Sequence, residues 1–262
     1  MEIKKFVQLI VLLAFSHQLL AQKEAYQKEM YLKGVDTLNY RIMYPKDFSA
    51  EKEYPIVFFL HGAGERGSDN EKQLVHGSAL FLKEENLNKF PAIIVFPQCP
   101  TEDYWSNAKV NRKKRPVSFK YKNRKKPTEA LGLVMDLVDE TIEKPYVKKD
   151  QVYVMGLSMG GMGTFELLYR KPNIFAAAIP ICGGGDPKGT KEYAAKVPLW
   201  IFHGAKDDVV SPHLSIKMAD KIIENGGHPN LTIYSDANHN SWDAAFAETE
   251  LLTWLFSNKL KQ

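Results

Sequence analysis

Short runs of consecutive apolar residues recur along the chain, and each run leads into a polar or glycine-rich segment. The clearest run covers residues 56–60, where five apolar residues lead directly into His61 and Gly62. Continuous apolar runs of this length are typical of strands that are buried on both faces of a sheet. The same pattern predicts further strands at 92–96, 152–155, 176–181, 199–202 and 231–234.

Segments with the apolar spacing of helices lie between these runs. Residues 128–143 are an example, since Leu133, Leu137 and Val138 recur at helical spacing. Further helices are predicted at 162–170, 213–224 and 242–260, and a hairpin of two strands, 30–32 and 38–44, precedes the first buried strand. Strands that alternate with helices indicate a mainly parallel sheet with helices on both faces. Because no repeat or linker divides residues 22–262, they predict one α/β domain.

The N-terminus differs from the rest of the chain and predicts a targeting segment. Lys4 and Lys5 precede an apolar run at 6–15, and Ala21 provides a small residue for cleavage. This is the layout of a secretory signal peptide over residues 1–21. The run is shorter than the roughly 20 residues that a spanning helix needs, so a retained anchor is the weaker alternative. We therefore expect a periplasmic or secreted protein with no stable membrane anchor after signal removal.

Polar residues that carry chemistry are expected directly after the buried strands, because the carboxyl ends of parallel strands meet at one edge of the sheet. The sequence Gly156-Leu-Ser158-Met-Gly160 follows the strand at 152–155 and leads into a predicted helix. A G-x-S-x-G turn in this setting projects the serine hydroxyl at the top of the sheet. The motif alone occurs by chance, and its place between strand and helix is what predicts Ser158 as a nucleophile.

A serine nucleophile needs a base, and the base needs a carboxylate that orients it. His239 is the predicted base, since it is the only histidine that follows the last strand. Asp207 and Asp208 follow the strand at 199–202 and compete for the role of the acid, because adjacent side chains cannot both face one imidazole. Asp236 is a third candidate, but it lies too close to His239 in the sequence to reach across easily. The residues alone leave Asp207 and Asp208 open.

Backbone N–H groups are needed to hold the oxyanion of a tetrahedral intermediate. One is expected from Met159, the residue after the nucleophile. The other is expected from the glycine-rich loop after the first buried strand, at Ala63 or at Gly64. His61 and His203, which directly follow strands, are expected to brace their loops.

Cys99 and Cys182 each follow a predicted strand. An exported chain could pair them, but two cysteines do not make a disulfide framework, and small buried thiols are the favoured interpretation. No group of cysteines and histidines has the spacing of zinc ligands, so no metal site is predicted.

Six motifs spread over most of residues 22–262 occur together. They are His61-Gly-Ala-Gly-Glu-Arg-Gly67, Pro97-Gln-Cys-Pro100 followed by Trp105, Gly156-Leu-Ser-Met-Gly-Gly161, Pro180-Ile-Cys-Gly-Gly184, His203-Gly-Ala-Lys-Asp207 and His239-Asn-Ser-Trp242. As a set they resemble bacterial α/β-hydrolases described as predicted peptidases or esterases, near the feruloyl and acetyl-xylan esterases and the dienelactone hydrolases. The resemblance implies a single-domain α/β-hydrolase fold and a Ser-His-Asp acyl hydrolase that needs no cofactor. It also implies Asp207 as the acid, since the aspartate of the H-G-x-x-D pattern has that role in the family.

One stretch departs from the family pattern. The net charge of the chain is +4, yet ten of the eighteen residues from Lys109 to Lys126 are lysine or arginine and none is acidic. This insertion-like segment, residues 106–126, follows a strand at its carboxyl end and is therefore expected to rim the active site. It is either a solvated loop or a basic rim that attracts polyanionic substrates such as uronic-acid-bearing polysaccharides. Nucleic acid is not expected as a partner.

Aromatic residues near the predicted site suggest how a substrate binds. Tyr104 and Trp105 are expected to offer a stacking surface for a sugar or an aryl group, and Trp242 is a third candidate for substrate binding. The leading hypothesis is a secreted serine esterase, a carbohydrate esterase that removes acetyl or hydroxycinnamoyl groups from plant-type polysaccharides. The first alternative is a peptidase like prolyl oligopeptidase, whose relatives usually carry a further domain. The second is a non-catalytic carbohydrate-binding relative, which would lack a member of the triad.

Overall fold

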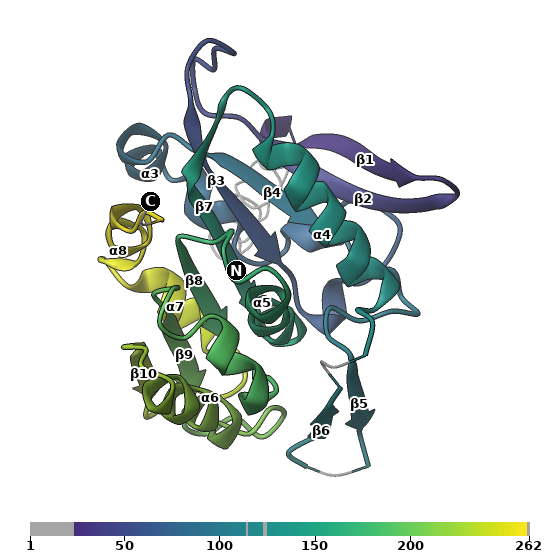
Figure 1. Cartoon of the computed structure of the whole chain (residues 1–262), viewed down its shortest axis with the longest axis vertical. Helices are drawn as coiled ribbons and strands as arrows, with labels where there is room; N and C mark the ends of the chain where they lie inside the picture. The colour runs from purple at the N-terminus through teal and green to yellow at the C-terminus, as the bar shows by residue number, and fades with distance from the viewer. Residues whose placement is uncertain (1–23, 114, 123–124, 261–262) are drawn as a thin grey trace, which may run out of the picture.

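An eight-stranded sheet forms the centre of the computed structural model, which describes residues 24–113, 115–122 and 125–260 (Figure 1). The strand order is β1-β2-β4-β3-β7-β8-β9-β10. β1 pairs antiparallel with β2, β2 pairs antiparallel with β4, and the other neighbouring strands are parallel. The strands are β1 (Gln27–Lys33), β2 (Asp36–Met43), β3 (Tyr54–Leu60), β4 (Ile93–Pro97), β7 (Val147–Leu157), β8 (Ala177–Ile181), β9 (Trp200–Gly204) and β10 (Asn230–Tyr234). The predicted mainly parallel sheet is confirmed.

The central strand β3 explains why the sequence shows unbroken apolar runs. Its residues Ile56, Phe58 and Leu60 belong to the hydrophobic cluster on one face of the sheet. Val57 and Phe59 belong to the cluster on the other face. Because successive side chains of a strand point to opposite faces, a strand that is covered on both faces has no position for a polar side chain.

Helices cover both faces of the sheet, as predicted (Figure 1). The first cluster includes residues of α4 (Glu129–Ile142), α5 (Met159–Arg170) and α6 (His213–Glu224). The second cluster is covered by α2 (Ser78–Leu82), α3 (Glu84–Lys89), α7 (Trp242–Ala247) and α8 (Leu251–Ser257). Three 3-10 helices complete the described elements: η1 (Ala63–Glu65), η2 (Lys72–Leu74) and η3 (Pro187–Glu192).

Two predicted helix boundaries are wrong. The helix expected over 242–260 is interrupted after Ala247, because Glu248 adopts an extended backbone (φ −63°, ψ 120°), and α7 and α8 replace it. Helix α5 begins at Met159, directly after the candidate nucleophile, instead of at residue 162. This earlier start brings the N-terminus of α5 to the site.

Within the basic segment 106–126, the described residues include two antiparallel strands, β5 (Ala108–Asn111) and β6 (Ser118–Tyr121), which pair as a hairpin. It forms a separate two-stranded sheet that extends from the body of the molecule below α5 (Figure 1). Half-buried and exposed residues alternate along both strands. The interpretation as a mere solvated loop is therefore wrong, because one face of the hairpin is partly covered by the protein.

Cys99 and Cys182 are both buried and unpaired, which confirms the interpretation as small buried thiols. The predicted signal peptide, residues 1–21, lies outside the described residues and stays a prediction. Among the helices of the described ranges, none combines the length and the apolar character needed to cross a membrane.

Candidate active site

Ser158 lies in a sharp turn between β7 and α5, with φ 53° and ψ −114°. A non-glycine residue in such a backbone conformation costs about 1–3 kcal/mol and persists only where the surrounding structure enforces it. The flanking glycines allow the turn, because a Cβ on Gly160 would overlap the carbonyl oxygen of Leu60, and one on Gly156 would overlap the carbonyl of Gly160. The turn therefore holds the Ser158 hydroxyl at the carboxyl edge of the sheet.

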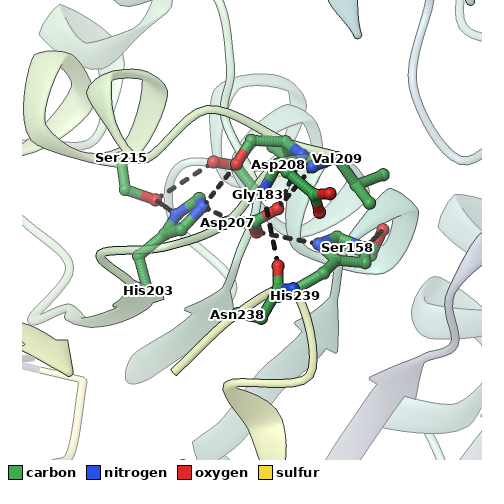
Figure 2. Close-up of polar contacts among 10 residues, drawn as sticks. Ser158, Gly183, His203, Asp207, Asp208, Val209, Ser215, Asn238 and His239 are labelled. Carbon is green, nitrogen blue, oxygen red and sulfur yellow. Dashed lines mark hydrogen bonds and ion pairs between the residues drawn. The ribbon is translucent and has the colours of Figure 1, made fainter. Parts of the chain in front are cut away.

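A chain of hydrogen bonds connects Ser158, His239 and Asp207 (Figure 2). Ser158 Oγ lies 3.0 Å from His239 Nε2, and His239 Nδ1 lies 2.8 Å from Asp207 Oδ2. Burial raises the pKa of the Asp207 carboxyl, but hydrogen bonds from His203 and His239 outweigh it and hold this pKa well below its usual range. Since Asp207 is ionised and only accepts, His239 Nδ1 carries the proton, and Nε2 is free to accept the Ser158 proton.

The structure separates the three candidate acids. Asp207 is 4% exposed, and its second oxygen, Oδ1, accepts hydrogen bonds from the backbone of Val209 and Val210 at 2.9 and 2.8 Å. Asp208 is exposed, and the hydrogen bond recorded for it is from its backbone N–H to Asn238 Oδ1, at 3.4 Å. The Asp236 side chain is 90% exposed and pairs with Lys206. Only Asp207 of the three reaches His239.

A second histidine also contacts the acid. His203 Nε2 lies 3.1 Å from Asp207 Oδ2 and 2.9 Å from the carbonyl oxygen of Val210. Because a carbonyl can only accept, this nitrogen carries a proton that it shares between the two oxygens. His203 Nδ1 lies 2.7 Å from Ser215 Oγ (Figure 2). His203 thus braces its loop, as expected, and it also orients the carboxylate, which sequence reasoning missed.

Two backbone N–H groups are placed to receive an oxyanion. Within the described part of the chain, the N–H groups of Met159 and Ala63 donate to no protein acceptor. Met159 starts α5, and the positive end of the helix dipole favours negative charge at this point. The loop that contains Ala63 approaches the nucleophile closely, since a Cβ on Gly62 would lie 3.8 Å from Ser158 Cβ. The N–H of Gly64 is likewise unused in the described ranges, so it stays the alternative to Ala63.

His61 braces this loop. Its Nε2 accepts from the backbone N–H of Cys99 at 3.0 Å, and its Nδ1–H donates to the Gly62 carbonyl at 2.6 Å. Burial lowers the pKa of His61 to about 4, so the imidazole is neutral at pH 7. Both ring nitrogens are used, which fits the expected structural role.

A cleft of about 240 Å³ opens over Ser158 and His239. Tyr104 and Trp242, both half-buried, form part of its walls. The ring of Trp242 packs edge-on against His239, with 5.4 Å between centroids, so the wall also fixes the imidazole. The complete lining is Gly62, Ala63, Gly64, Glu65, His76, Tyr104, Arg112, Val117, Phe119, Leu157, Ser158, Val209, Val210, His239 and Trp242.

The prediction that Trp105 offers a stacking surface for substrate is wrong. Its side chain has no solvent exposure, and its indole N–H donates to the carbonyl of His61 at 3.1 Å. A Cβ on Gly163 of α5 would lie 2.6 Å from Trp105 Cβ, so the glycine of the helix makes room for the tryptophan. Trp105 belongs to the core that supports the glycine-rich loop.

The basic segment was expected at the rim of the site, and three of its residues line the cleft, whereas Glu65 and His76 were not predicted to line it. Arg112 and Phe119 come from the basic hairpin. Glu65 and His76 also line the cleft, with Glu65 Oε1 3.8 Å from His76 Nε2. The alternation of apolar residues in the hairpin, at Val110, Phe119 and Tyr121, was the available signal for a half-buried pair of strands. Nothing in the sequence pointed to His76.

Ligand atoms of Cys182, Asp207 and His239 lie within 4.8 Å of one another. Burial raises the pKa of the Cys182 thiol. The carboxylate and the imidazole are already hydrogen-bonded to each other. The group is better explained as a nucleophile–base–acid arrangement with a buried thiol behind it.

Residues 47–251 match the family model of phospholipases and carboxylesterases. The chain belongs to this family. A thermostable esterase of known structure is 31% identical to this carboxylesterase-family chain, with a TM-score of 0.80. The match covers 90% of this chain and 64% of the chain of that esterase. The bifunctional acetylxylan esterase/xylanase XynS20E of Neocallimastix patriciarum is 32% identical over 78 residues, which are 30% of this chain and 12% of that protein. The chain thus spans less than two thirds of either relative.

More distant structures share the fold alone. A ferulic acid esterase is 16% identical, with a TM-score of 0.59, and the match covers 88% of this chain and 98% of the chain of that esterase. Dipeptidyl peptidase 4 of Porphyromonas gingivalis is 15% identical, with a TM-score of 0.62 over 89% of this chain and 35% of its own. The predicted α/β-hydrolase fold and the resemblance to its esterases are confirmed.

Proposed function

We propose that this carboxylesterase-family chain is a serine esterase that hydrolyses carboxylic esters through Ser158, His239 and Asp207. The observation that carries the proposal is the unbroken hydrogen-bond chain from Ser158 Oγ through both nitrogens of His239 to the buried carboxylate of Asp207. This is the geometry that a serine needs in order to lose its proton as it attacks an acyl carbon.

The first half of the reaction forms an acyl-enzyme. Ser158 Oγ attacks the acyl carbon while His239 Nε2 takes the hydroxyl proton, and the ionised Asp207 stabilises the resulting imidazolium. The N–H groups of Met159 and Ala63 hold the oxyanion of the tetrahedral intermediate. Removal of one such donor typically costs about 10²–10³ in rate. The intermediate then collapses, and His239 gives the proton to the departing alcohol.

The second half releases the acid. A water molecule replaces the alcohol beside His239 Nε2, loses a proton to it and attacks the acyl carbon of the ester on Ser158. The second tetrahedral intermediate uses the same two N–H donors, and collapse returns the proton to Ser158 Oγ. The protein supplies every group that these steps require, so the proposed reaction needs only ester and water.

The proposed substrates are acetyl or hydroxycinnamoyl esters on plant-type polysaccharides, met by a protein that is exported. The name of the acetylxylan esterase/xylanase, similar over 78 residues, and the aromatic walls Tyr104 and Trp242 support this choice. Export rests on the predicted signal peptide at 1–21. The peptidase alternative is supported by similarity of fold to peptidase structures that are 15% and 18% identical, so the esterase is preferred.

A panel of substrates tests the proposal. Rates are measured on 4-nitrophenyl acetate, methyl ferulate, acetylated xylan and a peptide amide with the wild type and with Ser158→Ala. We expect ester hydrolysis by the wild type and loss of at least about 10³-fold in the variant. Activity that survives in Ser158→Ala would overturn the mechanism, and cleavage of the amide alone would replace the esterase with the peptidase.

A further inference from the structure

The basic hairpin is attached to the helix that follows the nucleophile. Glu166 of α5, only 1% exposed, accepts hydrogen bonds from Ser106 Oγ at 2.8 Å and from Asn107 N at 2.7 Å, where the segment begins. Arg170, one turn later, pairs with Glu166 at 2.7 Å and donates to the carbonyl of Lys125, where the segment ends. Both ends of the hairpin are therefore held by one buried ion pair.

The hairpin is also joined to the loop of the catalytic acid. Val117, 4% exposed, donates its backbone N–H to the carbonyl of Val209 at 2.8 Å, and the N–H of Val209 donates to Asp207 Oδ1. A two-stranded hairpin is marginally stable by itself. These attachments hold this one as a fixed wall of the cleft.

The two faces of the hairpin differ in chemistry. Arg112, Val117 and Phe119 line the cleft. On the exposed face Lys109 stands directly opposite Lys120 in the strand register. Like charges in directly opposed positions destabilise a pair of strands, so this arrangement is not explained by the stability of the hairpin.

Cations near the cleft lack carboxylate partners. Among the described residues, neither Arg112 nor Arg66 forms an ion pair with an acid, and the hydrogen bonds of Arg66 go to the carbonyls of Ala63, Thr101 and Asp103. The Arg66 guanidinium lies 6.0 Å from the centroid of the Tyr104 ring, and Arg112 lines the same cleft as Tyr104. Glu65 is the one acid of the lining, and its Oε1 lies 3.8 Å from His76 Nε2.

We propose that Arg112 binds a carboxylate on the saccharide half of the ester, so that the site selects acylated polysaccharides that carry uronic acids. A guanidinium matches the two oxygens of a carboxylate with paired N–H donors. Phe119 and Tyr104 supply apolar surface beside it for the sugar ring. This inference rests on the proposed esterase function and names its substrate class.

The test compares two forms of one substrate. Acetylated oligogalacturonide is offered as the free acid and as the primary amide, and kcat/KM is measured from acetate release with 4-nitrophenyl acetate as a third substrate. Arg112→Gln removes the charge at the cleft. Lys120→Gln removes the same charge from the exposed face of the same hairpin and is the matched control.

We expect the wild type to prefer the free acid over the amide by at least about tenfold, the effect of one charged hydrogen-bonded contact. Arg112→Gln should reduce this ratio to within about twofold of unity, while Lys120→Gln keeps it within about twofold of the wild type. If both variants lose this preference equally, the preference comes from the summed positive charge of the hairpin, and the role of Arg112 is overturned.

The remaining outcomes separate the two proposals. If the wild type cleaves 4-nitrophenyl acetate through Ser158 but shows no preference for the free acid, the carboxylate site is wrong and the esterase stands. If Ser158→Ala cleaves 4-nitrophenyl acetate as fast as the wild type, the proposed mechanism through Ser158 is wrong. The saccharide assignment is also overturned if the protein hydrolyses phosphatidylglycerol vesicles in a manner that depends on Arg112 and shows no preference between the acid and amide forms of the oligogalacturonide. The guanidinium would then bind a lipid phosphate.

Discussion

Replacement of Asp207 by asparagine tests the electrostatic core of the site. The carboxylate receives four hydrogen bonds, two at Oδ1 from backbone N–H groups and two at Oδ2 from His203 and His239. All four partners are donors in the tautomers assigned above. An amide of the same shape has one oxygen and one NH₂ group, so it can satisfy only one of the two pairs.

The structure indicates which pair is lost in Asp207→Asn. The backbone donors cannot change their character, so the amide oxygen should face them and the NH₂ group should face the imidazoles. His239 must then accept at Nδ1 and carry its proton on Nε2, where it can no longer accept from Ser158. The same substitution in a Ser-His-Asp triad of another protein lowers kcat by about 10⁴, which corresponds to about 5.4 kcal/mol of transition-state stabilisation.

The assay is kcat for 4-nitrophenyl acetate at pH 7 for Asp207→Asn, with Asp208→Asn as the matched control. Asp208 is adjacent, equally charged and exposed, so its variant should retain activity within about twofold of the wild type. Circular dichroism and the thermal midpoint of each variant show whether a loss of activity comes from the changed tautomer of His239 or from unfolding. We expect the Asp207 variant to fold, with a loss of about 1–3 kcal/mol in the free energy of unfolding.

Two results would refute this reasoning. A folded Asp207→Asn that keeps more than about a tenth of the wild-type kcat would show that the carboxylate does not set the tautomer of His239. A loss in Asp208→Asn as large as that in Asp207→Asn would show that the assignment of the acid is wrong.

Two further predictions concern stability. Glu166→Ala removes the carboxylate that pairs with the guanidinium of Arg170, whose side chain is 11% exposed, so the free energy of unfolding should fall by about 3 kcal/mol or more. Glu166→Gln should lose less stability. A thermal midpoint of Glu166→Ala that is no lower than that of Glu166→Gln would contradict this prediction. Burial raises the pKa of Asp69, but hydrogen bonds from Lys72, Glu71 and Gln98 hold it well below its usual range. Because this pKa is lower in the folded state, its contribution to stability is present above about pH 4 and is lost as the pH falls further. The free energy of unfolding, measured with denaturant between pH 5 and 2.5, should therefore fall less steeply with pH for Asp69→Asn than for the wild type. An equal slope for the two proteins would contradict this role of Asp69.

Much of the fold could be predicted from local features. The apolar runs at 56–60 and 152–155 mark strands that are covered on both faces, because no polar side chain is tolerated on either face of such a strand. The glycines around Ser158 mark the turn, since a Cβ at Gly156 would overlap the carbonyl of Gly160, four residues further along the chain. These requirements act on single residues or on neighbours in the chain, so the sequence records them directly.

Other features depend on which side chains face each other across the molecule. Asp207 and Asp208 are chemically identical neighbours, and the residues alone left them open. The structure distinguishes them because the loop turns one toward His239 and the other toward solvent. Tyr104 and Trp105 looked equivalent as surfaces for a ligand, but the space left by Gly163 buries the tryptophan.

The sequence by itself determined the strand pattern, the turn at the nucleophile, and the order of the serine, the acidic loop and the histidine. Tertiary structure alone decided the direction of the acid, the contact of His203 with it, and the attachment of the basic hairpin to Glu166 and Arg170. The physical reason is that steric and apolar requirements of a segment are local, whereas the position of a charge relative to a reacting atom is set by contacts between segments far apart in the chain.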